Sequence, residues 1–148
     1  MKRNSGLGVL IFAVSMAIVS GIAVSGLLTT QRVLSSSGSV KAINVEVYWD
    51  ALCTQVVDSV DWGTPGPGDS VSKTVYVKNI GNAPLTLSMS CSGWNPSEAQ
   101  TYLTLSWDAE GAQVNADEVV TAVLTLSVSE SVTGITDFSF NIVIEGSG

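Results

Sequence analysis

The chain has 148 residues, enough for one domain, with a net charge of −7 and a sequence pI of about 4.2. This acidic balance argues against nucleic-acid binding, which depends on a basic surface. The sequence contains no histidine, so it lacks the side chain most often used as a general base and as a transition-metal ligand.

The first 25 residues have the pattern of an export leader. Lys2 and Arg3 precede an uncharged run from residue 7 to residue 28. A secretory signal peptide has this pattern, and residues 23–25, Ala-Val-Ser, supply a small-x-small cleavage site. The run is also long enough to span a bilayer as an uncleaved anchor, and a pilin-type cut near residue 6 is a third alternative. All three place the rest of the chain outside the cytoplasm, so we expect a secreted or cell-surface protein.

Residues 26–40 separate this leader from the domain, which we expect to span residues 41–148. Ser35 to Gly38 have the composition of a flexible joint. Residues 27–34 alternate between two possible strand faces, Leu28-Thr30-Arg32-Leu34 and Leu27-Thr29-Gln31-Val33. The stretch is therefore either a linker, acting as a stalk above a membrane, or an extended strand that pairs with another sheet.

From Lys41 onward apolar and polar residues alternate with a period of two, which predicts strands with one buried face. The alternating segments are residues 45–50, 75–78, 85–92, 103–108, 120–129 and 138–144. Gly- and Pro-containing turns separate them, as in residues 63–69 and 81–84. We predict an all-β fold, a two-sheet β-sandwich of jelly-roll or immunoglobulin-like form, with seven strands and an optional eighth over residues 54–60. Trp62 and Trp94 lie near turns, where we expect them to close the ends of the sandwich.

Two cysteines, Cys53 and Cys91, fit an exported protein. Two thiols in an oxidising compartment usually pair, so we expect a Cys53–Cys91 disulfide. The alternative is two small buried apolar side chains. Cys91 shares the parity of Leu85, Leu87 and Met89, so its side chain is expected to point inward in either case.

Catalytic motifs are missing from the sequence. Without histidine there is no Ser-His-Asp triad and no His-Glu-x-x-His zinc site. An irregular calcium site near Asp58, Asp61 and Asp69 stays open, because calcium binds carboxylates but this spacing is not diagnostic. We expect no enzymatic activity, no cofactor and no small-molecule substrate.

Several segments together resemble a known group of exported proteins. They are VYWDALC at residues 47–53, VDWG at 60–63, KTVYVKNIGN at 73–82, LTLSW at 103–107 and GITDFSFNIVI at 134–144. This series resembles a family of exported archaeal single-domain proteins. More distantly, it is similar to the TasA/camelysin-type biofilm-matrix fibre subunits and to archaeal bundling pilins.

The resemblance implies a jelly-roll-like sandwich, a cleaved signal peptide and self-association into a filament by donor-strand exchange. In that process the free N-terminal segment of one subunit adds as a strand to the sheet of the next. The candidate donor strand consists of Leu27, Leu28, Thr29, Thr30, Gln31, Arg32, Val33 and Leu34. Camelysin-type relatives have been described as proteases, but this chain has no histidine and no recognisable nucleophile arrangement, so that activity is not carried over.

Overall fold

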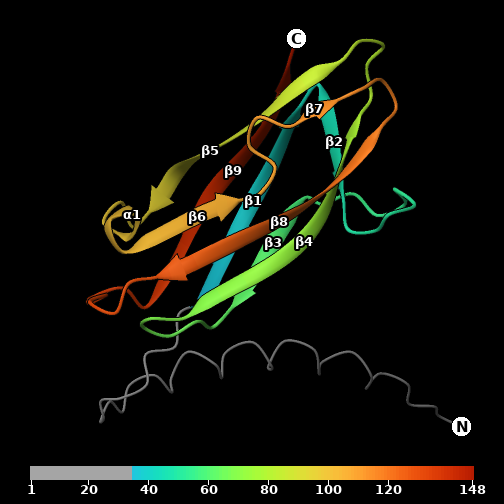
Figure 1. The fold of residues 1–148 in the computed structure, drawn as a ribbon. Helices are drawn as coiled ribbons and strands as arrows, with labels where there is room; N and C mark the ends of the chain where they lie inside the picture. The colour runs from blue at the N-terminus through green and yellow to red at the C-terminus, as the bar shows by residue number, and fades with distance from the viewer. Residues whose placement is uncertain (1–34) are drawn as a thin grey trace, which may run out of the picture. The chain divides into compact units, whose positions relative to one another are not determined.

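The computed structural model of the protein describes residues 35–148, which form two β-sheets and one short helix (Figure 1). The first sheet has the strand order β3-β1-β9-β5-β7, and the second has the order β2-β4-β8-β6. The elements are β1 (Ser35–Ile43), β2 (Val45–Tyr48), β3 (Ser59–Gly63), β4 (Ser70–Asn79), β5 (Leu85–Asn95), α1 (Ala99–Tyr102), β6 (Leu103–Trp107), β7 (Gln113–Val114), β8 (Val119–Val128) and β9 (Asp137–Ser147).

Both sheets contribute alternate side chains to a single core. In β9 every second residue from Phe138 to Ile144 is buried, and β8 shows the same alternation from Ala122 to Val128. Large, fully buried side chains come from both sheets: Trp62, Leu87, Leu124, Leu126, Phe140, Ile142 and Ile144. The period-two pattern thus confirms the predicted all-β fold with two sheets, because only strands bury every second side chain.

The first strand lies where the sequence predicted a flexible joint. Each of the nine residues of β1 pairs in parallel with β9, from Ser35 opposite Asp137 to Ile43 opposite Glu145. On its other side β1 pairs antiparallel with β3. The prediction of a joint at residues 35–38 was therefore wrong, and strand structure begins six residues before the expected start at Lys41.

Close packing explains why a Ser- and Gly-rich stretch forms a central strand. Gly38 lies against Ile142 and Trp62, and a Cβ atom at Gly38 would lie 3.2 Å from Ile142 Cδ1 and 3.2 Å from Trp62 Nε1. Ser36 is buried, and its hydroxyl donates a hydrogen bond to the carbonyl of Gly63 at 3.2 Å. The small residues are thus required by the neighbours of β1, not by a need for flexibility.

The strand count also differs from the expected seven or eight, since the described residues contain nine strands. β7 has two residues, too few to show a periodic pattern. The optional strand over residues 54–60 is displaced: β3 begins at Ser59, and Val56 forms only an isolated bridge with Tyr48. The expected leader, residues 1–25, lies outside the described residues. Within residues 35–148 no helix is both long and apolar enough to cross a membrane.

Asn79 is a buried polar side chain at the end of β4 that ties the turn after β4 to β7. It is fully buried, and its amide donates to the carbonyls of Ala83 at 2.7 Å and Val114 at 3.0 Å. Its side-chain oxygen accepts a hydrogen bond from the backbone N–H of Gly81 at 2.8 Å. Asn79 therefore fixes the turn after β4 and attaches β7 to it.

We expect Gly38→Ala to lower the free energy of unfolding by about 1–3 kcal/mol, because the added methyl group overpacks the contact with Ile142 and Trp62. Chemical denaturation of the purified protein measures this change. Ser37→Ala is the matched control, since Ser37 is exposed on the same strand and its substitution should stay within about 0.5 kcal/mol. Equal stability of the Gly38→Ala variant and the parent protein would contradict the packing described for β1.

We expect Asn79→Ala to cost about 3 kcal/mol of unfolding free energy, because it leaves two carbonyls and one N–H without their partner. Asn115→Ala serves as the comparison, because Asn115 is exposed and its side chain makes no hydrogen bond that the fold depends on. In the same denaturation experiment, the Asn79→Ala variant should have a clearly lower denaturation midpoint than the Asn115→Ala variant. Similar midpoints would show that the Asn79 side chain does not hold the turn after β4 and β7 together.

Candidate interaction site

The two cysteines lie in separate parts of the fold and are both free thiols. Cys53 lies in the connection between β2 and β3, whereas Cys91 lies in β5 of the first sheet. The expected Cys53–Cys91 disulfide is therefore not formed in the structure. The inward direction predicted for Cys91 is found, since its side chain packs partly buried against the core. Burial raises the pKa of the Cys91 thiol, which keeps it protonated.

Cys53 belongs to a tightly hydrogen-bonded loop. The carboxylate of Asp50 accepts hydrogen bonds from the Thr54 hydroxyl at 2.6 Å, from the Thr54 N–H at 2.9 Å and from the Gln55 N–H at 2.9 Å. These bonds, the one from the Thr54 hydroxyl above all, lower the pKa of Asp50 below its ordinary value. This loop also covers the outer edge of β2, because the Trp49 N–H donates to the Gln55 carbonyl.

Asp58, Asp61 and Asp69 do not form a cation site in the described structure. Asp61 accepts a hydrogen bond from the Gly63 N–H, and Asp69 accepts one from the Gly66 N–H, both at 2.8 Å. Residues 35–148 contain no group of three or more acidic, cysteine or histidine side chains placed to hold a metal ion. The two carboxylates are thus used as local turn acceptors.

The two tryptophans near turns both pack against Phe140. Trp62 is 1% exposed and belongs to the core. Its ring is stacked on Phe140 with centroids 6.5 Å apart. Trp94 is partly buried and stacks more closely on Phe140, at 4.2 Å. Both rings are thus used in packing around Phe140.

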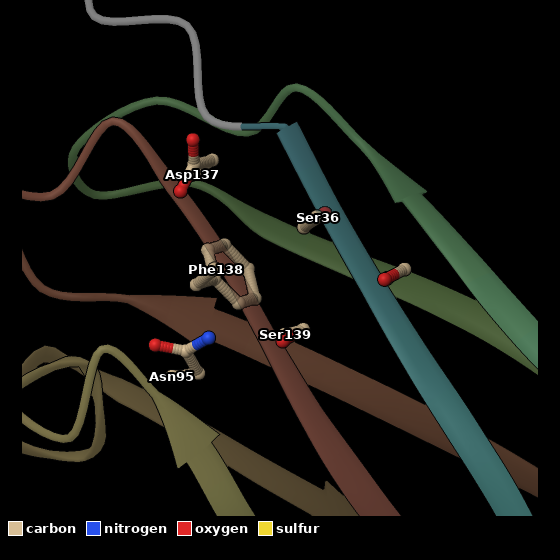
Figure 2. A pocket seen from close by; sticks show the side chains of 6 residues that line it. Ser36, Asn95, Asp137, Phe138 and Ser139 are labelled. Atoms are coloured by element: carbon tan, nitrogen blue, oxygen red, sulfur yellow. The ribbon is translucent and has the colours of Figure 1, made fainter.

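The candidate donor strand, Leu27 to Leu34, lies outside the described residues, but the place where it joins the sandwich is described. Two shallow hollows, of about 340 and 520 Å³, lie beside the start of β1 and share Ser36 and Ser37 as lining residues. The smaller one is completed by Asn95 and by residues 137–139, as Figure 2 shows. Ser36 and Asn95 thus border the same hollow, so β1 begins at the end of the sandwich where β5 finishes.

The sequence did not reveal that one edge of β5 lacks a strand partner over most of its length. β7 pairs with β5 only at Leu85 and Thr86, and Leu87 exchanges hydrogen bonds with the backbone of Gly111 and Ala112. From residue 88 to residue 95 no strand of the described chain lies on that side of β5. A row of unpaired backbone groups at an edge is a template for adding another strand.

A side chain takes the place of a strand at the start of this open edge. The Glu110 carboxylate accepts hydrogen bonds from the Met89 N–H at 3.0 Å and from the Trp107 indole N–H at 2.7 Å. One oxygen thus joins the edge of β5 to the end of β6. Exposed edge strands usually carry charges, but LTLSMSCSGWN at residues 85–95 has none, so the sequence resembles that of a strand paired on both sides.

No protein-family model and no curated protein matches the chain. The structure itself therefore supplies the classification. The described residues define an all-β protein with two sheets around one core, and the outer side of β5 has no strand partner from residue 88 to residue 95.

Ionisation of the Tyr48 side chain makes the stability of the fold depend on pH. Its hydroxyl donates a hydrogen bond to the Glu46 carboxylate, and this bond, followed by burial, raises the pKa of Tyr48 from 10.0 to about 12. Because the folded state binds the proton more tightly, this contribution to stability is present below about pH 10. It is lost as the pH rises from about 10 to about 12.

We expect Glu46→Gln to bring the Tyr48 pKa down toward 10.0, because a neutral amide stabilises the protonated phenol less than a carboxylate does. Titration of phenolate absorbance measures the change. The absorbance step near pH 12 is assigned to Tyr48 if it is missing from the Tyr48→Phe variant. A Tyr48 step that persists unchanged in the Glu46→Gln variant would show that Glu46 is not its cause.

Proposed function

We propose that this protein is a structural subunit of an extracellular filament, a pilus or biofilm-matrix fibre, which polymerises by N-terminal donor-strand exchange. In this proposal the partner is a second copy of the chain, the mature protein is secreted, and the sandwich has a jelly-roll-like form. The role requires no cofactor, no nucleic acid and no small-molecule substrate.

The observation that carries the proposal is the position of β1. It begins at Ser35, directly after the candidate donor strand, and it lies between β3 and β9 instead of at an edge. Its backbone is held on both sides by hydrogen bonds. The segment of residues 27–34 is therefore followed at once by an element that is paired on both sides, which supports its proposed role as a strand presented to a neighbour.

The outer face of the second sheet supports close packing of like-charged copies. It carries rows of hydroxyl side chains on β4, β6 and β8: Ser70, Ser72, Thr74, Thr104, Ser106, Thr121, Thr125 and Ser127. Two cross-strand pairs are hydrogen-bonded, Ser70 with Ser127 at 3.1 Å and Ser72 with Thr125 at 3.0 Å. The rows themselves carry no charge, and the charged residues of the same face, Glu46 on β2 and Lys78 on β4, lie opposite each other and are of opposite sign.

We expect replacement of residues 27–34 by a Ser/Gly segment of equal length to abolish filaments, because that segment has no apolar side chains to bury in a neighbour. Electron microscopy of material sheared from cells shows the filaments. Intact-mass analysis shows whether the mature chain starts near Gly26.

The control for this variant is its unfolding transition, which should match that of the parent protein because the sandwich begins at Ser35. Filaments that still form with the replaced segment would contradict the donor-strand proposal. Protein found only in membranes, with residues 1–25 retained, would instead identify residues 26–40 as a stalk.

A further inference from the structure

The sandwich has two lateral margins, one along β2 and β3 and one along β5 and β6, and the side chains at these margins are buried to different degrees. At the β2–β3 margin the inward side chains are sealed: Val45, Val47, Val60 and Trp62 are at most 3% exposed. At the β5–β6 margin Leu87 and Leu103 are also buried. The other inward side chains there are only partly buried: Met89, Cys91, Trp94, Leu105 and Trp107. The core is therefore incompletely covered along β5 and β6, which α1 connects (Figure 1).

The backbone of β5 is open on the same margin. The N–H and C=O of Leu87 both point away from β9, because they bond to Ala112 and Gly111. Alternate residues of a strand present their backbone groups to the same side, so Met89 and Cys91 point theirs to this side as well. The Met89 N–H is taken by Glu110, and beyond it the Cys91 N–H and C=O face a side with no strand.

We propose that this edge of β5, residues 88–95, is the acceptor site, and that its occupant is residues 27–34 of a second copy of the chain. The placement rests on the proposed function and specifies where on the subunit the donor strand binds. The regular part of the edge runs from Ser88 to Ser92, before the register shift between Ser92 and Asn95, and a segment of eight residues is long enough to cover it. An added strand would satisfy the Cys91 backbone groups and cover the partly buried Met89 and Cys91 side chains.

Within its own subunit, the segment would reach this edge with only part of its length. The strand order places β9 and β5 between β1 and an added strand, a distance of three strand spacings or about 14 Å. Crossing it takes about four extended residues, which is half of the segment that ends at Leu34. A donor from another copy can pair with its whole length, so a second copy is the better occupant.

Charge favours β5 over another edge of the first sheet, the outer side of β3. The β3 edge carries Asp61 and follows Asp58, and its inward side chains Val60 and Trp62 gain nothing from further cover. The β5 edge has no charged residue, and the acidic side chain at its start is Glu110. The donor segment has a single charge, that of Arg32, which is opposite in sign to Glu110.

Cysteine cross-linking of the full-length chain tests this placement, with Cys91 as the reporter already in the acceptor edge. In a Cys53→Ser background, each of residues 27–34 is changed to cysteine in turn, and assembled material is oxidised and run on non-reducing gels. Side chains directly opposite each other on neighbouring strands lie close enough for a disulfide. We expect a ladder of covalent multimers from alternate positions of the segment, on one of its two faces, and loss of the ladder on adding Cys91→Ser.

The matched control moves the acceptor thiol to the other margin by combining Cys91→Ser with Ser59→Cys, at the exposed start of β3. No ladder is expected there, and a ladder at Ser59 would overturn the β5 placement. Cross-linked monomers would overturn it in favour of the segment's own subunit. Dimers formed by Cys91 alone, without an engineered thiol, would overturn it in favour of two β5 edges pairing with each other.

Failure of the acceptor placement and failure of the proposed function give different results. Filaments seen in the Cys53→Ser background, with no segment position cross-linking to Cys91, would overturn the β5 site and leave donor-strand exchange standing. Absence of filaments from the unmodified chain would overturn both.

Discussion

The parallel ladder between β1 and β9 is the interaction on which the rest of the structure depends. It joins the first nine described residues to the last strand of the chain, and it sets β1 between β9 and β3. Gly38 can then lie against Ile142 and Trp62, so the core of the first sheet is filled by side chains from its neighbours. Without β1, the sheet would divide into β3 on one side and β9, β5 and β7 on the other.

The sequence predicted the strands whose alternation is long, and it missed those whose alternation is hidden. β8 and β9 carry apolar residues at every second position, so their period and their buried faces could be predicted. β1 could not, because Ser35 to Gly38 have the composition of a linker, and only their partners reveal a strand. β3 was displaced for a related reason, since the five residues of SVDWG alternate too briefly to fix a boundary.

The candidate site was less predictable than the fold, because it depends on which elements become neighbours. The parity of Cys91 gave its direction correctly, but nothing in the sequence placed Cys53 in a loop between β2 and β3. Likewise, the role of Glu110 depends on β7 ending after two residues, which leaves Met89 to a side-chain acceptor. The resulting asymmetry, with one sealed margin and one partly covered margin, emerges only from the packed molecule.

The direction of β1 relative to β9 also has a mechanical consequence. Because the two strands are parallel, β1 starts at one end of the sandwich and β9 finishes at the other. Tension applied between the segment before Ser35 and the C-terminus would slide β1 along β9, so all nine residue pairs bear the load together instead of breaking one after another. Resistance to forced unfolding is set by the unfolding rate, and shear along a ladder of this length makes the rate-limiting step a concerted one. The topology thus places the strongest direction of the domain along the line that connects its two chain ends.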